Sequence, residues 1–354
     1  MKIDLIITCY KPDKTFFEVV ETMSRQIVPV NKIIVLNVEQ KYFDRVVYSG
    51  KFMDNHKNVE VHHVSRREFD NGRLRNAAVK YSDADYFLMM TQDSIPVGTE
   101  LVSDLLKPFL NDESVAVSYA RQVHRANMPE AEKYAKKYYY PEDSFTTSLA
   151  DFENMGVRAF HSSNACAMYK RNIFDSLGGF TNHAITNEDV LFAANACHEG
   201  YKIAYSSEAV IIYSTVMENK DYMKKYFDLA VSCLKHPEVF DYSVQKNENR
   251  KLFKIVLNHL KRDGFKHELL SFYIREYYKR KGFSKGKKYK KMTHKEIEHY
   301  TYNKSYWDID EMMRDRAGVN SKEGYGRSEK EREMLTTPPV KAKNKTENQL
   351  ISLK

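Results

Sequence analysis

Phe87–Pro96 reads FLMMTQDSIP, in which four apolar residues are followed by Thr91, Gln92 and Asp93 and then by a proline turn. A short apolar run that ends in polar and turn residues is typical of a central strand in an α/β sheet. Ligands of such sheets bind at the carboxyl ends of the strands. Asp93 is therefore predicted to lie in a ligand site, where a carboxylate can hold a divalent cation bound to a diphosphate. The alternative is that Asp93 caps a turn before a helix near residue 99.

Segments with strand-like and helix-like patterns alternate along residues 1 to about 120. This alternation predicts an α/β fold with a mostly parallel central sheet and helices on both of its faces. The polar residues that follow each strand are then the first candidates for a site. The predicted strands are 3–8, 32–37, 59–64, 85–91 and 115–120, and the predicted helices are 13–27, 73–81 and 101–110.

The rest of the chain changes character twice. Residues 121–160 show little periodicity and many aromatic residues, which predicts an insertion that shapes a substrate site. The later predictions are a helix at 187–199, strands at 202–206 and 209–213, and amphipathic helices at 247–262 and 266–281. The expected domains are a catalytic domain in residues 1–218, a basic helical extension in 219–319 and a disordered tail in 320–354.

The composition is that of a soluble globular protein, because the 354 residues are 42% hydrophobic and 29% charged, with a mean hydropathy of −0.62. No apolar run approaches the roughly 18 residues of a membrane-spanning helix. The N-terminal apolar run is too short for a signal peptide. The four cysteines are scattered without a Cys-x-x-Cys motif, which argues against structural zinc or a disulfide framework and for a reducing cytoplasm.

Positive charge is concentrated in residues 251–300, which hold 15 Lys and Arg against 5 Asp and Glu, whereas the whole chain carries only +8. Such a segment is expected to face an anionic partner, either nucleic acid or a membrane surface. Aromatic residues interleave with the cations in 266–291, which favours an anionic membrane surface. The alternatives are a solvated helix face and a helix packed on the catalytic domain. No nucleic-acid-binding module is recognisable, so no nucleic acid partner is expected.

A second chemical motif is the run of Asn187, Glu188 and Asp189, which follows a Gly-Gly pair and opens a predicted helix. The free backbone N–H groups of a helix start favour an ionised carboxylate there. Such a carboxylate can accept a proton from a sugar hydroxyl at neutral pH. The alternative is plain helix capping.

A third motif is EFDNGRLRNAA, Glu68–Ala78. Gly72 lets the chain turn, and Arg75 and Asn76 stand at a helix start. Backbone N–H groups, the helix dipole and an arginine together predict an anion site. Alone the motif is weak, because charged residues often open surface helices.

Together these segments, in this order, resemble the inverting family 2 glycosyltransferases, and most of all the bacterial rhamnosyltransferases of cell-surface polysaccharide synthesis. The resemblance spans residues 1 to about 245. The segments that carry it are Thr8–Tyr10, Glu68–Asn76, Thr91–Pro96, Ala120–Gln122, Tyr138–Ser144, Ser162–Arg171, Gly178–Phe180, Asn187–Ala194 and His236–Phe240.

The resemblance implies a GT-A fold that binds a nucleotide-diphosphate sugar, with Mg²⁺ or Mn²⁺ as cofactor. Asp189 matches the general base, and Asp93 matches the carboxylate that reaches the metal-bridged diphosphate. The residues that it places around the donor are Thr8, Tyr10, Asn37, Glu39, Arg75, Gln92 and Asp93.

The chain departs from the family pattern in two places. Asn71 replaces the histidine of the family's EFDHG string. Tyr213 and Thr215 stand where the family usually has a His-Ser-His string that can face the metal or the diphosphate. Tyrosine and threonine are poorer metal ligands than imidazole. The departures leave weaker metal binding, a changed donor and a lost activity open as alternatives.

The function that the resemblance implies is inverting transfer of L-rhamnose from dTDP-L-rhamnose onto a hydroxyl of a surface polysaccharide acceptor, which can be lipid-linked. The alternatives are a UDP-hexose donor on the same fold and a catalytically inactive homologue that scaffolds its partners. The protein would be cytoplasmic, and residues 251–300 would hold it on the inner face of the plasma membrane.

Overall fold

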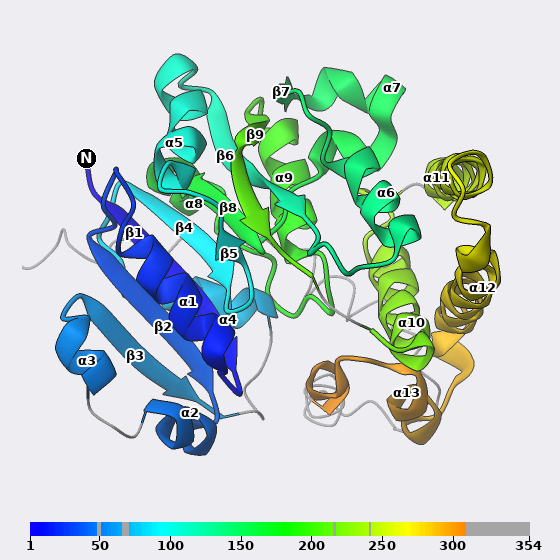
Figure 1. Ribbon diagram of the computed structural model, residues 1–354, viewed down its shortest axis with the longest axis horizontal. Coiled ribbons are helices and arrows are strands. Elements are labelled where there is room, and N and C mark those ends of the chain that lie inside the picture. The colour runs from blue at the N-terminus through cyan, green and yellow to red at the C-terminus, as the bar shows by residue number, and fades with distance from the viewer. Residues whose placement is uncertain (48–50, 66–70, 215–216, 241, 309–354) are drawn as a thin grey trace, which may run out of the picture.

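The computed structural model describes residues 1–47, 51–65, 71–214, 217–240 and 242–308, with the side chains of 51 and 242–247 left aside (Figure 1). Glu68, Thr215 and the tail predicted at 320–354 lie outside the described residues. A nine-stranded sheet forms the centre of the molecule, and the later part of the chain is a group of helices at its side.

The sheet is mostly parallel, as predicted. Its strand order is β3-β2-β1-β4-β8-β6-β9-β5, and β7 pairs with β9. Strands β8, β5 and β7 run against the other six. The strands are β1 Ile3–Tyr10, β2 Lys32–Val38, β3 Val59–Val64, β4 Tyr86–Thr91, β5 Ile95–Pro96, β6 Val115–Val123, β7 Phe145–Thr147, β8 Cys166–Lys170 and β9 Lys202–Ile212.

Two apolar layers cover the two faces of the sheet. Helices α1 and α5 pack on one face, and α4, α8 and α9 pack on the other. Helix α1 shows why: Phe16, Val20 and Met23 fall on one side of the helix at spacings of three and four, and all are fully buried. The helices of these layers, with the shorter ones at the rim, are α1 Lys14–Met23, α2 Gln40–Val47, α3 Lys51–Asn55, α4 Asn71–Val79, α5 Leu101–Asn111, α6 Glu130–Tyr139, α7 Phe152–Met155, α8 Arg171–Ser176 and α9 Glu188–His198.

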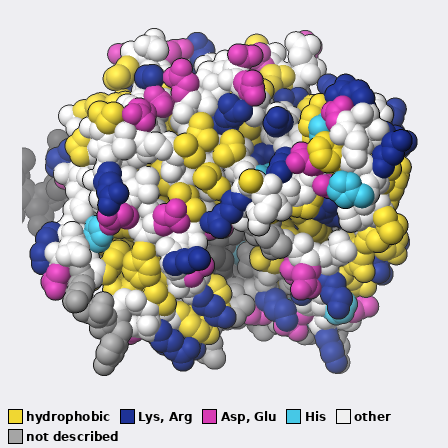
Figure 2. Space-filling view, in the orientation of Figure 1, with side chains coloured by type: hydrophobic (Ala, Val, Ile, Leu, Met, Phe, Trp, Pro, Cys, Tyr) yellow, Lys and Arg dark blue, Asp and Glu magenta, His cyan; other side chains and the backbone are white. Residues whose placement is uncertain are grey.

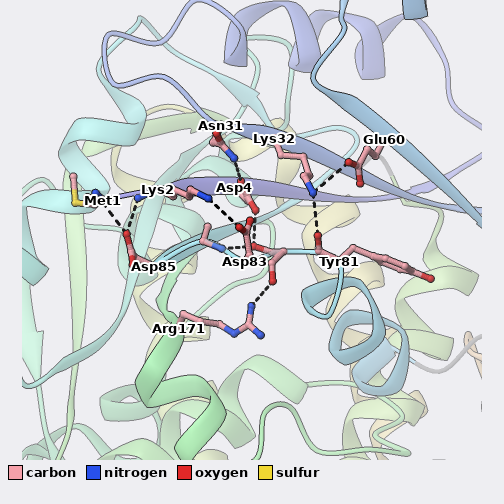
Figure 3. A network of polar contacts seen from close by, with 12 residues as sticks. Met1, Lys2, Asp4, Asn31, Lys32, Glu60, Tyr81, Asp83, Asp85 and Arg171 are labelled. Carbon is pink, nitrogen blue, oxygen red and sulfur yellow. Dashed lines mark hydrogen bonds and ion pairs between the residues drawn. The ribbon is translucent and has the colours of Figure 1, made fainter.

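A polar network fixes the amino edge of the sheet (Figure 3). The fully buried carboxylate of Asp4 accepts a hydrogen bond of 2.6 Å from the Ser82 hydroxyl. Lys2 pairs with Asp83 at 2.9 Å, and the Arg171 guanidinium donates to the Ser82 carbonyl at 2.7 Å. These contacts join the starts of β1 and β4 to the end of β8, so the opposite, carboxyl edge is left for a ligand.

Two predictions about the strands were incomplete. The segments 202–206 and 209–213 form one strand, β9, whose pairing with β6 shifts register between Ser206 and Val210. An irregularity of this kind interrupts the sequence pattern without ending the strand. Strand β8 was missed, although it lies at the centre of the sheet, because five residues give too little periodicity. The predicted insertion at 121–160 contains α6, β7 and α7.

The C-terminal helices are present, as predicted, and pack closely on one another. Helix α12 lies against α10 through Gly282 and Gly286, where an added Cβ would stand 1.9 Å from the Met223 carbonyl oxygen and 2.4 Å from that of Phe227. Trp307 is fully buried in an apolar cluster that also contains Phe227 of α10. The alternative of a helix packed on the catalytic domain holds for another part of α12, because Arg275 pairs with Glu132 of α6 at 3.0 Å. The helices are α10 Asn219–Lys235, α11 Tyr242–Arg262, α12 Leu269–Gly286 and α13 His294–Tyr300.

Candidate active site

The carboxyl ends of β1, β2 and β4 meet where the chain reverses its direction across the sheet. From β1 the chain adds β2 and β3 on one side and then returns to place β4 on the other side. Such a switch point opens a crevice at the carboxyl edge. Three residues at this edge have left-handed backbones, namely Lys11 (φ 50°), Glu39 (φ 67°) and Asn187 (φ 67°). Strained backbone of this kind gathers at functional sites.

The end of β1 is held by the side chain of Gln92. Its amide accepts from the Tyr10 backbone N–H at 2.8 Å and donates to the Tyr10 carbonyl at 3.1 Å. The Tyr10 ring meets Tyr42 edge-on at 5.6 Å, and the Lys11 ammonium lies 4.9 Å from the Tyr42 ring. Thr8 is half-buried beside Thr91 on the neighbouring strand. Gln92 thus positions Tyr10. Tyr42 and Lys11 lie next to Tyr10, on the side of the site where the donor is predicted to bind.

The end of β2 carries the two other residues predicted on the donor side. Asn37 is fully buried and its amide lies 3.0 Å from Nδ1 of His63. Its Oδ1 atom has no hydrogen-bond partner among the described residues. Glu39 is half-buried, and its carboxylate lies 3.5 Å from the Lys41 ammonium. Their contact with a base and ribose stays a prediction.

Asp93 stands directly after β4, half-buried, and no described residue donates a hydrogen bond to its carboxylate. A carboxylate left free in this way can bind a metal ion. Within the described residues, the one group of three clustered metal-ligating side chains lies elsewhere, at His294, Glu298 and Asp308 around α13. Asp93 therefore fits as a single protein ligand, and the other ligands of a metal at this place would be donor phosphates and water.

Lys136, on α6, is a site residue that the sequence did not reveal. Its ammonium donates to the Tyr213 carbonyl at 2.6 Å and lies 5.0 Å from the Tyr213 ring. Burial and the Lys225 ammonium lower the pKa of Lys136 to about 8, while the carboxylates of Glu132 and Asp93 oppose the shift. The side chain is thus still mostly charged at pH 7. The Lys136 ammonium therefore lies beside Tyr213, the residue that stands in the sequence where the family usually has a histidine.

His124 is a second residue missed from the sequence. It follows β6, and its Nδ1 lies 3.3 Å from the hydroxyl of Ser214, directly after Tyr213. Burial and the Lys136 ammonium lower the pKa of His124 to about 4, so the imidazole is neutral at pH 7. Both residues fall in the segment with little periodicity, and only their polar character could have drawn attention to them.

Asp189 stands at the start of α9, where the sequence placed it. Its carboxylate accepts from the backbone N–H of Asn164 at 2.9 Å and from that of Val190 at 2.9 Å. Burial and the neighbouring Glu188 carboxylate raise the pKa of Asp189 to about 6. Asn187 makes no side-chain cap of this helix. Asp189 is half-buried, and two backbone N–H donors orient its carboxylate. Its pKa lies near the pH at which a general base works.

Arg75 forms a buried ion pair with Glu188, a residue to which the sequence assigned no role. The amide of Asn164 donates to the same Glu188 carboxylate at 3.1 Å, and the Tyr169 hydroxyl donates to Asn164 at 2.8 Å. The Arg75 guanidinium is therefore engaged beside Asp189. Binding of a diphosphate by Arg75 stays a prediction.

The glycine and asparagine of the third motif hold α4 against the loop that leads to α9. Asn76 exchanges two hydrogen bonds with the Phe180 backbone, of 2.8 and 2.9 Å. An added Cβ at Gly72 would stand 2.0 Å from the Thr181 carbonyl oxygen. The third motif and the Gly-Gly-Phe segment are thus two halves of one contact.

Replacing Arg75 with Met should destabilise the fold by about 3–5 kcal/mol, because it leaves the Glu188 carboxylate buried without its cation. The Arg75→Met/Glu188→Gln double variant should recover much of this loss. Urea unfolding at pH 7.5 measures both, with the exposed pair partner Arg25→Met as the matched control. A loss below about 1 kcal/mol in Arg75→Met would show that the pair does not hold the site.

Comparison with known proteins supports the family resemblance. Residues 4–178 match the sequence model described as glycosyl transferase family 2. The chain is 28% identical to the O-antigen chain rhamnosyltransferase RfbN of Salmonella typhimurium, over 87% of this chain and 96% of that protein. It is also 28% identical to the O-antigen chain rhamnosyltransferase WbaN of Salmonella anatum, over 69% of this chain and 78% of that protein.

Among solved structures, the chain is similar to the mannosyltransferase PcManGT of Pyrobaculum calidifontis, which was solved with GDP-Man and Mn²⁺. The TM-score is 0.51 at 12% identity, over 90% of this chain and 88% of that one, a likeness of fold. Together with the parallel sheet, these matches show that residues 4–178 are a glycosyl transferase family 2 domain with a GT-A fold.

Proposed function

We propose that the protein transfers L-rhamnose from dTDP-L-rhamnose, with inversion, onto a hydroxyl of a surface polysaccharide acceptor. The observation that carries the catalytic part is Asp189, held by two backbone donors with a raised pKa. The names of the two curated relatives support the sugar and the kind of acceptor.

The reaction needs a base because a sugar hydroxyl is a poor nucleophile. Asp189 takes the proton of the acceptor hydroxyl as its oxygen attacks the anomeric carbon. The bond from that carbon to the donor phosphate breaks on the opposite face, which inverts the configuration. Burial and the Glu188 carboxylate keep Asp189 basic, because both raise its pKa, whereas the Arg75 guanidinium lowers it.

The leaving nucleoside diphosphate carries negative charge that the site must offset. Asp93 would hold Mg²⁺ or Mn²⁺ on the diphosphate, and such an ion stabilises the departing charge. The Lys136 ammonium would supply a second positive charge, because it lies beside Tyr213 and Asp93 acts on its pKa. In this proposal Lys136 compensates for the missing histidines.

The two alternatives differ from this proposal in measurable ways. A UDP-hexose donor would leave the site chemistry unchanged and alter only which nucleotide sugar is consumed. A catalytically inactive scaffold would need no general base, and the aimed carboxylate of Asp189 argues against it.

A panel of nucleotide sugars tests the function. The wild-type protein should hydrolyse or transfer from dTDP-L-rhamnose in preference to UDP-hexoses. Asp189→Asn should lower kcat by about 10²–10⁴-fold with little change in donor affinity, because the amide keeps its size but cannot take the proton. The wild-type kcat should fall as pH drops below about 6, where Asp189 becomes protonated. Near-normal turnover in Asp189→Asn would remove this residue from the base role, and Asp175→Asn is the exposed control.

Donor binding tests the charges around the diphosphate. Lys136→Met should weaken binding of dTDP by roughly 10-fold or more and leave thymidine binding unchanged, because only the diphosphate loses its cation. Asp93→Ala should remove the part of dTDP affinity that a chelator also removes. Calorimetry with and without Mn²⁺ measures both, with the Lys133→Met variant on the same helix as control. Equal dTDP binding by Lys136→Met and wild type would exclude the proposed diphosphate contact.

We also propose that α12 docks the protein on the cytoplasmic face of an anionic membrane. Leu270, Tyr273, Ile274 and Tyr277 form a stripe at helical spacing, with exposed fractions of 72%, 46%, 40% and 60%. Figure 2 shows hydrophobic side chains gathered on this side of the molecule, over α12. Among the described helices, none combines the length and apolar composition needed to cross a bilayer. An apolar stripe next to lysines suits binding at the bilayer surface.

Sedimentation with phosphatidylglycerol-containing vesicles tests this docking. Four exposed lysines follow α12, and each is worth about 1 kcal/mol near an anionic surface before screening. Replacing them with Gln should release the protein, whereas the same change at four exposed lysines of the catalytic half should not. The first set is Lys287, Lys288, Lys290 and Lys291, and the control set is Lys14, Lys57, Lys80 and Lys137.

Separate replacement of the stripe distinguishes insertion from charge attraction. Leu270→Ser with Tyr277→Ser should weaken vesicle binding at high salt, where the lysines are screened. If both lysine sets pellet alike, or if the wild-type protein does not pellet, the lysines are a solvated face.

A further inference from the structure

A cavity of about 370 Å³ lies between α6, α10, α11 and α12. Figure 1 shows α11 and α12 as neighbours at the side of the molecule away from β3. The volume is within the range of small-molecule sites, roughly 300–1,000 Å³. Among the described residues that line it are Glu132, Arg250, Phe253, Phe272, Glu276 and Arg280.

One wall of the cavity is apolar and largely aromatic. Phe253 of α11 stacks on Phe272 of α12, with ring centroids 5.3 Å apart and planes 20° from parallel. Behind them, Val256 and Ala131 are buried in the same apolar cluster. A surface of this kind binds an aliphatic chain by removing apolar area from water.

The side chains that line the cavity carry more positive than negative charge, and two arginines supply part of the excess. Its two carboxylates are already paired, Glu132 with Arg275 at 3.0 Å and Glu276 with Lys279 at 2.8 Å. Arg250 and Arg280 line the same cavity, and neither has a carboxylate partner among the described residues. Arg280 instead lies over the Phe253 ring, 5.0 Å from its centroid. Guanidinium groups beside an aromatic wall are suited to a phosphate attached to an apolar chain.

We propose that this cavity binds a phosphate ester of a long aliphatic alcohol, with the chain against Phe253 and Phe272 and the phosphate on Arg250 and Arg280. Helix α12 lines the cavity and also carries the exposed stripe, so such an amphiphile could be reached from a membrane surface. Within the proposed function, the ligand would be the lipid end of a lipid-linked acceptor. Only that identification rests on the proposed function; binding itself does not.

Helix α6 connects the cavity to the active site. Glu132 lines the cavity, and Lys136 lies four residues later on the same side of the helix. Glu132 and Asp93 both act on the pKa of Lys136. A ligand bound beside Glu132 in the cavity is thus one helical turn from the Lys136 ammonium in the active site.

Dodecyl phosphate, below its micelle concentration and without nucleotide present, is the probe for a calorimetric test. We expect saturable binding to one site. Inorganic phosphate lacks the chain and dodecyl maltoside lacks the charge, so both should bind at least 10-fold more weakly. Arg250→Gln/Arg280→Gln should weaken dodecyl phosphate binding by roughly 10- to 100-fold. Lys254→Gln/Lys261→Gln removes the same charge from exposed positions of α11 outside the cavity and should have no effect.

A second variant fills the cavity without touching its charges. Ser284→Trp places a large ring at the exposed lining position and should abolish binding while circular dichroism shows an intact fold. Unchanged binding in this variant, or in the double arginine variant, would overturn the proposal. So would equal affinity for dodecyl maltoside, which would indicate adsorption of any detergent. If the wild-type protein shows no glycosyl transfer, the proposed function is overturned, but the binding results for the cavity are unaffected.

Discussion

The buried ion pair between Arg75 and Glu188 is the interaction on which the active site depends. It joins α4 to α9, and Asn164 ties the segment before β8 to the same carboxylate. A buried charge without its partner is costly, so the three segments must stay together. Asp189, the next residue, is thereby fixed at the carboxyl edge, where burial and the Glu188 carboxylate raise its pKa and the Arg75 guanidinium opposes the shift. The pair thus sets the position of the proposed base.

The site balances its charges from elements that are far apart in the sequence. Asp93 comes from the end of β4 and Lys136 from α6, while the neutral His124 follows β6. Tyr213 stands where the family usually has a histidine, and the Lys136 ammonium of another helix donates to its carbonyl. A charge acts through distance and not through chain order, so a residue remote in sequence can supply the positive charge at this place.

The C-terminal helices owe their two surfaces to how closely α12 approaches α10. Gly282 and Gly286 allow backbone contact on one face, which leaves Leu270 and Tyr277 of the opposite stripe exposed. The space between α6, α10, α11 and α12 stays open as a cavity, with two paired carboxylates and two arginines that have no carboxylate partner among the described residues. A helix that looks uniformly basic and aromatic in sequence thus has a packing face, a solvent face and a cavity wall.

The sequence by itself determined the α/β class, the parallel strands β1 to β4 and the positions of Asp93 and Asp189 at element ends, because burial periodicity and turn chemistry are local. Only the tertiary structure decided the central place of β8, the unity of β9 and the partner of Arg75, which lies 113 residues away. It also decided the arrival of Lys136 beside Tyr213. Pairs such as these are set by packing between distant segments, and a local pattern carries no record of which buried charge meets which.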